Sequence, residues 1–290
     1  LDMGFFEDIE KIIAKMSTKR QTLLFSATFP KEIERMCHEV QNDAIRITIE
    51  EEASTSLNIA QCCVRMEEDE KESALKALLL AENPKSAIIF CKTKVGVSEL
   101  QAYLYDEGFD ALSLHGDLEQ IDRDEHLLLF ANGSAQILVA TDLASRGLDI
   151  KDVEMVINYD LPQTIEIYTH RIGRTGRMGK EGMAIRFVSQ AEEDFLEELQ
   201  KAEMAFTCKE ASALSSSKKR PSPALFVTLC IDGGKKQKLR AGDILGTLTK
   251  DIGLKAECIG KITIMEKYTY VAITRAQVDS AFDGLCATTI

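Results

Sequence analysis

The stretch "QILVATDLASRGLDIKDVEMVINYD", residues 136–160, contains two short apolar runs joined by a polar segment. The runs "QILVAT" (136–141) and "MVINYD" (155–160) are continuously apolar rather than alternating, which is typical of parallel strands buried on both faces. Similar strands are predicted at 86–91, 111–115 and 182–188, with helices at 96–108 and 119–133. This alternation predicts an α/β domain, a parallel sheet with helices on both faces.

The segment before this domain predicts a helix, a strand and a second helix. "FFEDIEKIIAKM" (5–16) has an apolar face, "QTLLFSAT" (21–28) is typical of a short strand, and Pro30 opens another helix that runs to about residue 40. The first residue is leucine rather than methionine, and a helical pattern begins almost at once. We therefore expect a fragment of a longer protein, in which residues 1–50 are the end of an incomplete domain.

The C-terminal part is predicted to be a separate small domain. Residues 209–223, "KEASALSSSKKRPSP", are rich in Ser, Lys and Pro and lack an apolar face, which indicates a linker. Residues 224–290 then follow a β-α-β-β-α order, which resembles the RNA-recognition-motif (RRM) fold. That fold has a fourth strand, which we expect to be missing here.

The amino-acid composition limits the classes of protein to which this chain can belong. The net charge is −12, but the chain from Lys218 onward has 12 Lys and Arg against 7 Asp and Glu, which leaves −17 for the first 217 residues. A basic module on an acidic body favours a phosphate-bearing partner, although a chance distribution of solvated charges gives similar counts. The eight cysteines form no C-x-x-C pair, and no apolar run is long enough to span a bilayer. We expect a soluble, cytoplasmic protein with buried free thiols. The four histidines have no ligand spacing, so we expect no metal site.

The string "HRIGRTGR" (170–177) concentrates positive charge in the acidic part of the chain. Arg171, Arg174 and Arg177 are three residues apart, so a helical turn would place them near one face, and the intervening glycines let the backbone approach a ligand closely. Guanidinium groups are planar forks of donors that suit phosphate oxygens, which makes a triphosphate the natural partner. The alternative is a surface basic run that is paired with nearby acids.

A second polar segment, "VATDLASRGLDI" (139–150), follows the predicted strand "QIL". A hydroxyl, an arginine and a glycine amide at a strand end can hold a nucleic-acid backbone, and a carboxylate can hold a ribose hydroxyl. The alternative is an Asx-rich turn with an internal ion pair between Asp142 and Arg146.

Taken together, these strings resemble DEAD-box RNA helicases, superfamily-two ATPases that have two RecA-like domains. The other matching strings are "SAT" (26–28), "IIFCKTK" (88–94), "HGD" (115–117) and "QIDR" (120–123). They occur in the family's order over residues 1 to about 205. The resemblance implies that residues 51–208 form the second RecA-like domain, the helicase C-terminal domain, and that residues 1–50 end the first.

The resemblance also implies roles for individual residues. Arg174 and Arg177 match the arginines that reach the γ-phosphate of ATP, with His170 and Arg171 coupling the domains and Asp149 contacting the ribose. The positions that match RNA-backbone contacts are Thr93, Gly116, Arg123, Thr141, Arg146 and Gly147. Ser26 and Thr28 match the motif that links hydrolysis to strand separation.

Two family motifs are missing from the chain. It contains no G-x-x-x-x-G-K-[ST] loop and no D-E-A-D box, so the groups that cradle the phosphates and organise Mg²⁺ are absent. The chain therefore holds half of an ATP site, and we expect it to be inactive as an isolated polypeptide.

The C-terminal domain resembles the RNA-binding domain of the DbpA-like branch of this family, bacterial helicases that recognise a hairpin in large-subunit ribosomal RNA and act in ribosome assembly on pre-ribosomal particles. The cations predicted to bind RNA are Lys235, Lys236, Lys238 and Arg240, four in six residues. The usual aromatic strand motif is only partly present in "KYTYVAI", where Tyr268 and Tyr270 are either base-stacking residues or half-buried strand residues.

Two other classes of function remain open at this level. One is an RNA-binding protein without enzymatic activity, because the phosphate-cradling loop is missing. The other is a DNA-translocating helicase of the same superfamily, although DNA is not the expected partner because such enzymes usually depart from "TDLASRGLD". A coding sequence upstream of Leu1 with a Walker A lysine and a D-E-A-D box would exclude the RNA-binding protein without enzymatic activity. An ATPase that is stimulated only by ribonucleotides would exclude the DNA-translocating helicase.

Overall fold

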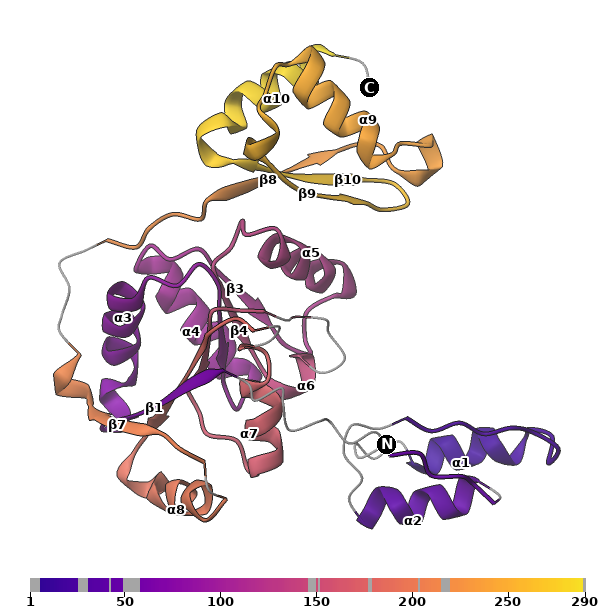
Figure 1. The fold of residues 1–290 in the computed structure, drawn as a ribbon, viewed down its shortest axis with the longest axis vertical. Coiled ribbons are helices and arrows are strands. Elements are labelled where there is room, and N and C mark those ends of the chain that lie inside the picture. The colour runs from indigo at the N-terminus through magenta and orange to yellow at the C-terminus, as the bar shows by residue number, and fades with distance from the viewer. Residues whose placement is uncertain are drawn as a thin grey trace. The chain divides into compact units, whose positions relative to one another are not determined.

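A computed structural model describes residues 6–25, 31–41, 43–48, 58–145, 150, 152–176, 179–202, 204–214 and 220–288 (Figure 1). The chain divides into two compact units, residues 1–54 and 55–290. Within the described residues, no helix is long and apolar enough to cross a membrane.

The first unit contains the two helices that the sequence predicts, α1 (Phe6–Ala14) and α2 (Lys31–Val40). The strand expected at 21–28 is not formed in its described part, residues 21–25, where the Phe25 side chain is 90% exposed. A strand needs a partner for its backbone groups, and the described residues of this unit supply none. Side chains hold the segment instead: Gln41 Nε2 donates to Thr22 O at 3.3 Å.

The second unit begins with a seven-stranded, wholly parallel sheet in the order β3-β4-β2-β5-β6-β1-β7. Its strands are β1 (Ile59–Arg65), β2 (Ala87–Phe90), β3 (Ala111–Leu114), β4 (Ile137–Ala140), β5 (Met155–Asn158), β6 (Gly182–Val188) and β7 (Thr207–Glu210). The helices that accompany it are α3 (Lys71–Glu82), α4 (Lys94–Asp106), α5 (Gln120–Ala131), α6 (Asp142–Ser145), α7 (Ile165–Ile172) and α8 (Glu193–Lys201).

Helices cover both faces of this sheet, because every central strand is apolar on both sides. In β2, Ile89 packs with the buried residues of α3 and α4, whereas Ile88 and Phe90 pack on the opposite face with α5 and α6. The helices α7 and α8 cover that second face over β1 and β6. The predicted fold class, a parallel sheet with helices on both faces, is confirmed.

Two strands at one side of the sheet, β1 and the edge strand β7, have no counterpart in the sequence analysis. β7 pairs with β1 in parallel, with Cys208 opposite Cys63, and extends two residues into the segment that composition marks as a linker. All four β7 residues are exposed, and they lack the apolar character by which the central strands were recognised. The sheet therefore continues to Glu210.

The C-terminal domain has three antiparallel strands, β8 (Phe226–Ile231), β9 (Ile259–Ile264) and β10 (Thr269–Thr274), in the order β8-β10-β9. Two helices, α9 (Ala241–Gly246) and α10 (Val278–Ala287), accompany the sheet. Their shared core includes the fully buried Ile244, Leu248, Val271, Ile273 and Ala281. The predicted β-α-β-β-α order is confirmed.

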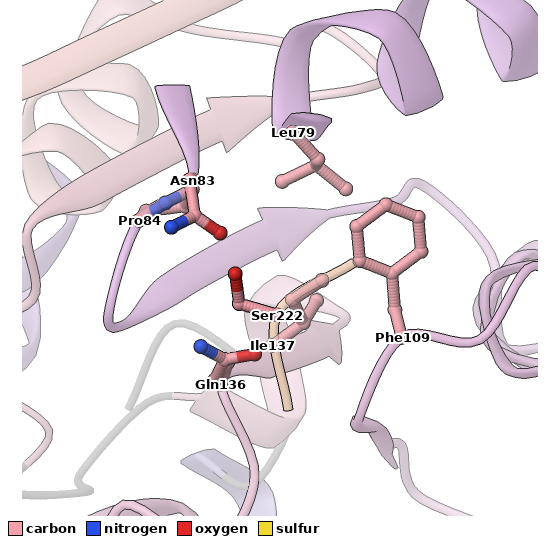
Figure 2. A pocket seen from close by; sticks show the side chains of 7 residues that line it. All are labelled: Leu79, Asn83, Pro84, Phe109, Gln136, Ile137 and Ser222. Carbon is pink, nitrogen blue, oxygen red and sulfur yellow. The ribbon is translucent and has the colours of Figure 1, made fainter. Parts of the chain in front are cut away.

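A small pocket opens at the amino ends of β2 and β4 (Figure 2). The side chains that line it are Leu79, Asn83, Pro84, Phe109, Gln136, Ile137 and Ser222. None of them is a predicted site residue, and the pocket lies at the sheet edge opposite the one where the predicted RNA contacts gather.

Candidate RNA- and nucleotide-binding site

Three of the predicted RNA contacts lie along one edge of the parallel sheet. Thr93 follows β2, Gly116 follows β3 and Thr141 follows β4, and these three strands are neighbours in the order β3-β4-β2. The carboxyl ends of parallel strands share one edge, where open α/β sheets bind their ligands. We call Thr93, Gly116 and Thr141 the grip edge. Thr93 and Gly116 are exposed, and Thr141 is half-buried.

At the grip edge, Thr93 also starts a helix. Its Oγ1 accepts a hydrogen bond from Gly96 N at 3.0 Å, which makes Thr93 the N-cap of α4. The hydroxyl hydrogen is still available as a donor, and the first turn of a 13-residue helix presents unpaired N–H groups with a positive dipole end. This arrangement suits a phosphate oxygen.

Side chains also join the loops of the grip edge to one another. Lys94 Nζ lies 2.7 Å from Asp117 Oδ2, linking the segment after β2 to the segment after β3. Arg123 Nη2 donates to Ala144 O at 2.6 Å, linking α5 to the end of α6. Arg123 is thus half-buried and engaged by a backbone carbonyl, so its predicted RNA contact would use the rest of its guanidinium fork.

Arg171 is the centre of a buried polar network behind this edge. Its side chain is 3% exposed, and its Nε and Nη2 donate to the two carboxylate oxygens of Asp142 at 2.6 and 2.7 Å. Its Nη1 donates to Asn158 Oδ1 at 2.9 Å and to Asp160 O at 2.7 Å. The guanidinium carbon also lies 4.9 Å from the centroid of the Phe90 ring. One side chain of α7 therefore holds the carboxyl ends of β2, β4 and β5 together.

This network was not foreseen from the sequence. The structure pairs Asp142 with Arg171, which is 29 positions away, while Arg146, the partner considered from the sequence, lies outside the described residues. Asn158 and Asp160 were not singled out at all. Asn158 is the last residue of β5 and Asp160 lies two residues beyond it, so polar residues at the end of a predicted strand are the signal that could have found both.

The expectation that Arg171 and Arg174 share a helical face is wrong. α7 ends at Ile172, and Arg174 lies one residue beyond its C-cap, Gly173. Arg174 O accepts from Val153 N at 3.2 Å, and Arg174 Nη1 donates to Ile150 O at 3.4 Å. Arg171 thus points into the protein, whereas Arg174 is half-buried beside the segment that leads into β5.

Gly176 has a packing role, and its expected role of letting the backbone approach a ligand stays a prediction. Its φ is +69°, and a Cβ at this position would lie 2.5 Å from Ile59 Cγ1. Glycine is required here because the turn needs left-handed backbone and presses against the start of β1. The backbone around Arg174 is therefore fixed. His170 is exposed in the last turn of α7.

Several predicted site residues lie outside the described part of the chain. They are Ser26, Thr28, Arg146, Gly147, Asp149 and Arg177. Among the residues that are described, no group of three or more His, Cys, Asp and Glu side chains could hold a metal ion.

The predicted RNA-binding cations of the C-terminal domain lie on a rigid turn. Lys235 N donates to Met265 O at 2.9 Å and Lys236 N donates to Glu266 O at 3.1 Å, so the backbone is anchored to the connection between β9 and β10. The side chains that extend from this turn into solvent are Lys235, Lys236, Lys238 and Arg240. We call these four residues the cationic turn.

The two tyrosines considered for base stacking differ in their surroundings. Tyr268 is 42% exposed and precedes the first residue of β10, whereas Tyr270 lies within β10 and is half-buried. Burial raises the pKa of Tyr270, with a further contribution from the thiol of Cys230. The upward shift in the pKa of Tyr270 reflects its partial burial. The side chains of the cationic turn are exposed, and Lys235 Nζ lies 3.7 Å from Glu266 Oε1.

Comparison with known proteins places both domains. Residues 70–179 match the family model described as helicase conserved C-terminal domain, and residues 228–290 match the DbpA RNA binding domain. A curated relative, the ATP-dependent RNA helicase DbpA of Escherichia coli (strain K12), is 42% identical over 288 residues. That alignment covers 98% of this chain and 62% of the relative, so the chain spans about three fifths of the relative's length.

Solved structures agree with the sequence matches. The C-terminal domain of the DEAD-box protein Dbp5 is 35% identical, with a TM-score of 0.50, over 54% of this chain and 92% of that one. Saccharomyces cerevisiae Dbp5 bound to RNA and ADP BeF3 is 30% identical, with a TM-score of 0.62, over 72% of this chain and 56% of that one. The seven-stranded domain is RecA-like, as expected. The chain belongs to the DEAD-box family, in its DbpA-like branch.

Proposed function

We propose that this chain is the RNA-gripping and arginine-bearing part of an ATP-dependent RNA helicase that separates RNA duplexes locally. The observation that carries the proposal is the Arg171 network. It holds the strand ends behind the grip edge from the same helix that leads into Arg174. Contacts to RNA at the grip edge and to a nucleotide beside Arg174, three residues after Arg171, would then be mechanically linked.

The residues present fit a role opposite a triphosphate. Phosphoryl transfer depends mainly on stabilising charge, and Arg174 supplies a guanidinium on a fixed backbone. Arg177 and Asp149 are proposed to join it, as γ-phosphate and ribose contacts. The groups that bind Mg²⁺ and cradle the phosphates are proposed to lie in the rest of the protein, because this chain has no Walker A loop and no D-E-A-D box. We expect no useful ATP hydrolysis from this chain alone.

We further propose that the C-terminal domain tethers the helicase to a hairpin of large-subunit ribosomal RNA, on cytoplasmic pre-ribosomal particles during ribosome assembly. Four cations on one anchored turn support this proposal, since a rigid positive surface binds a structured RNA without losing loop entropy. Tethering raises the effective concentration of duplex at the grip edge without requiring new contacts there.

The test of this function is the ATPase rate of the full-length protein with two RNAs of equal length. A fragment of large-subunit ribosomal RNA that contains hairpins is expected to stimulate turnover at a lower concentration than an unrelated RNA does. Equal stimulation by both RNAs would reject ribosomal RNA as the specific target, but it would still support an RNA helicase. No stimulation by any RNA would overturn the helicase and favour an RNA-binding protein.

The cationic turn predicts a change in the salt dependence of RNA binding. The double variant Lys236→Ala/Lys238→Ala is expected to flatten the slope of log affinity against log salt by roughly 1.5, because each lost phosphate contact removes about 0.7–0.9. The matched control is Lys255→Ala/Lys261→Ala, which removes the same charge from exposed positions elsewhere in the domain. Equal slopes for the two variants would show that the turn does not contact phosphate.

A further inference from the structure

Lys71, the first residue of α3, carries a buried ammonium group that the proposed site does not yet explain. Its side chain is 3% exposed, and Nζ lies 3.0 Å from Glu68 Oε1 and 3.4 Å from Asp160 Oδ1. Burial lowers the pKa of Lys71, but its bond to Glu68 and the charges of Asp160 and Glu192 outweigh burial and raise that pKa above its usual value. Lys71 is therefore charged at neutral pH, and it also lies 5.5 Å from the centroid of the Tyr159 ring.

The Asp160 carboxylate connects Lys71 to the grip edge. While Oδ1 faces Lys71, Oδ2 accepts a hydrogen bond from Lys92 N at 2.8 Å. The backbone of Asp160 is fixed as well, since its N–H donates to Phe90 O at 3.1 Å and its carbonyl accepts from Arg171. Lys92 immediately precedes Thr93. The carboxylate thus holds the segment between β2 and α4 at the point where Thr93 is presented.

A buried ion pair is a poor way to gain stability, because replacing one with apolar residues is often neutral or stabilising. It does, however, fix orientation. The Asp160 side chain is 26% exposed, so without Lys71 its carboxylate would turn toward water and release the Lys92 amide. A cation behind Oδ1 holds the carboxylate plane so that Oδ2 remains directed at Lys92.

We propose that Lys71 is a positioning residue for RNA binding: through Asp160 and the Lys92 amide it fixes Thr93 and the first turn of α4 at the grip edge. This inference rests on the proposed function, because that function is what assigns RNA binding to the grip edge. Lys71 does not touch RNA in this scheme. Its effect passes through two hydrogen-bonded groups.

The test uses Lys71→Met in the full-length protein, with Lys76→Met as the matched control. Lys76 lies on the same helix and is paired with Glu107, but it makes no contact with Asp160. Lys71→Met is expected to raise the KM for RNA in the stimulated ATPase by about tenfold, the scale of one charge-assisted hydrogen bond. The turnover at saturating RNA is expected to stay within about twofold, as it does when a change weakens binding alone. Lys76→Met should leave both parameters unchanged.

A second measurement does not depend on catalysis. Hydrogen exchange of the Lys92 amide is expected to accelerate about tenfold in Lys71→Met and not in Lys76→Met, because only the first loosens the bond to Asp160. If RNA fails to stimulate the unmodified protein, the proposed function is wrong, while the exchange result still decides whether Lys71 orders the segment. Unchanged exchange at Lys92 would overturn the inference itself.

The double variant Lys71→Met/Asp160→Asn separates positioning from general stability. An asparagine amide can accept from Lys92 without needing a cation, so the double variant should bind RNA about as well as Asp160→Asn alone. Additive losses would contradict a path through Asp160. If Lys71→Met does not fold, Lys71→Gln keeps an N–H donor near Oδ1 and is expected to raise the KM by about threefold. A normal KM in that variant would also count against the inference.

Discussion

Arg174→Ala in the full-length protein is expected to lower maximal ATPase turnover by about 10³-fold or more, the range over which an arginine that contacts a transferring phosphate acts. RNA affinity should stay within about twofold, because Arg174 is not one of the grip-edge residues and its loss should affect turnover alone. The backbone around Arg174 is held by Val153 and by the tight turn at Gly176, so truncation removes the side chain and leaves the turn in place. Single-turnover ATP hydrolysis and RNA titration are the two measurements.

Two controls sharpen this prediction. Arg174→Lys keeps a positive charge but not the planar fork, and it should recover little of the lost rate. Lys180→Ala removes an exposed cation whose partner is Asp152 at 3.6 Å, near the same corner of the sheet, and it should turn over normally. Turnover of Arg174→Ala within twofold of the parent would reject its role at the phosphate. An equal loss in Lys180→Ala would indicate a general effect of net charge.

Arg171→Met is expected to act on stability instead. It would leave Asp142 without its two bonds and would remove the donors to Asn158 and Asp160 O. Removing one partner of a buried pair costs about 3–5 kcal/mol of the free energy of unfolding. At about 2–4 °C per kcal/mol for a domain of this size, the melting temperature should fall by roughly 6–20 °C. Thermal and urea unfolding of the parent and variant measure both quantities.

A compensated variant distinguishes the pair from its surroundings. Arg171→Met/Asp142→Asn removes both charges, so the half-buried carboxylate is not left unpaired, and the loss should be smaller than in Arg171→Met alone. Arg171→Lys should remain destabilised, because one ammonium cannot reproduce the geometry of a fork with four bonds. A melting temperature of Arg171→Met equal to that of the parent would show that the network contributes nothing to the fold.

The elements that the sequence predicts correctly are those whose burial leaves a pattern. Ile137–Ala140 and Met155–Asn158 are buried at every position, so an unbroken apolar run marks them. β7 consists of four exposed residues that form a strand only because they can pair with β1. The sequence "TCKE" has no apolar pattern from which this strand could be predicted. The expected strand near Phe25 shows the reverse case, an apolar run without a strand partner among the described residues of its unit.

The same distinction applies to the candidate site. The resemblance assigned Thr93, Gly116 and Thr141 to the RNA backbone, and the structure brings them to one edge because each follows a strand of the same parallel sheet. The role of Lys71 could not be predicted, because a single lysine at the start of a helix is usually solvated. Its burial depends on Asp160, which is 89 positions away. Arg171 and Arg174 look alike in "HRIGRTGR", and only the end of α7 at Ile172 separates an internal residue from one beyond the helix.

The antiparallel sheet of the C-terminal domain has a consequence for association. β8 lies at one end of the order β8-β10-β9, and within the described residues nothing pairs with its outer side. Its core-facing side chains are already packed on one face, so another strand could add there through main-chain bonds without disturbing the interior. Within the described residues, the outer side of β8 therefore leaves main-chain donors and acceptors with which a further strand could pair, whether it comes from the same protein or from another molecule.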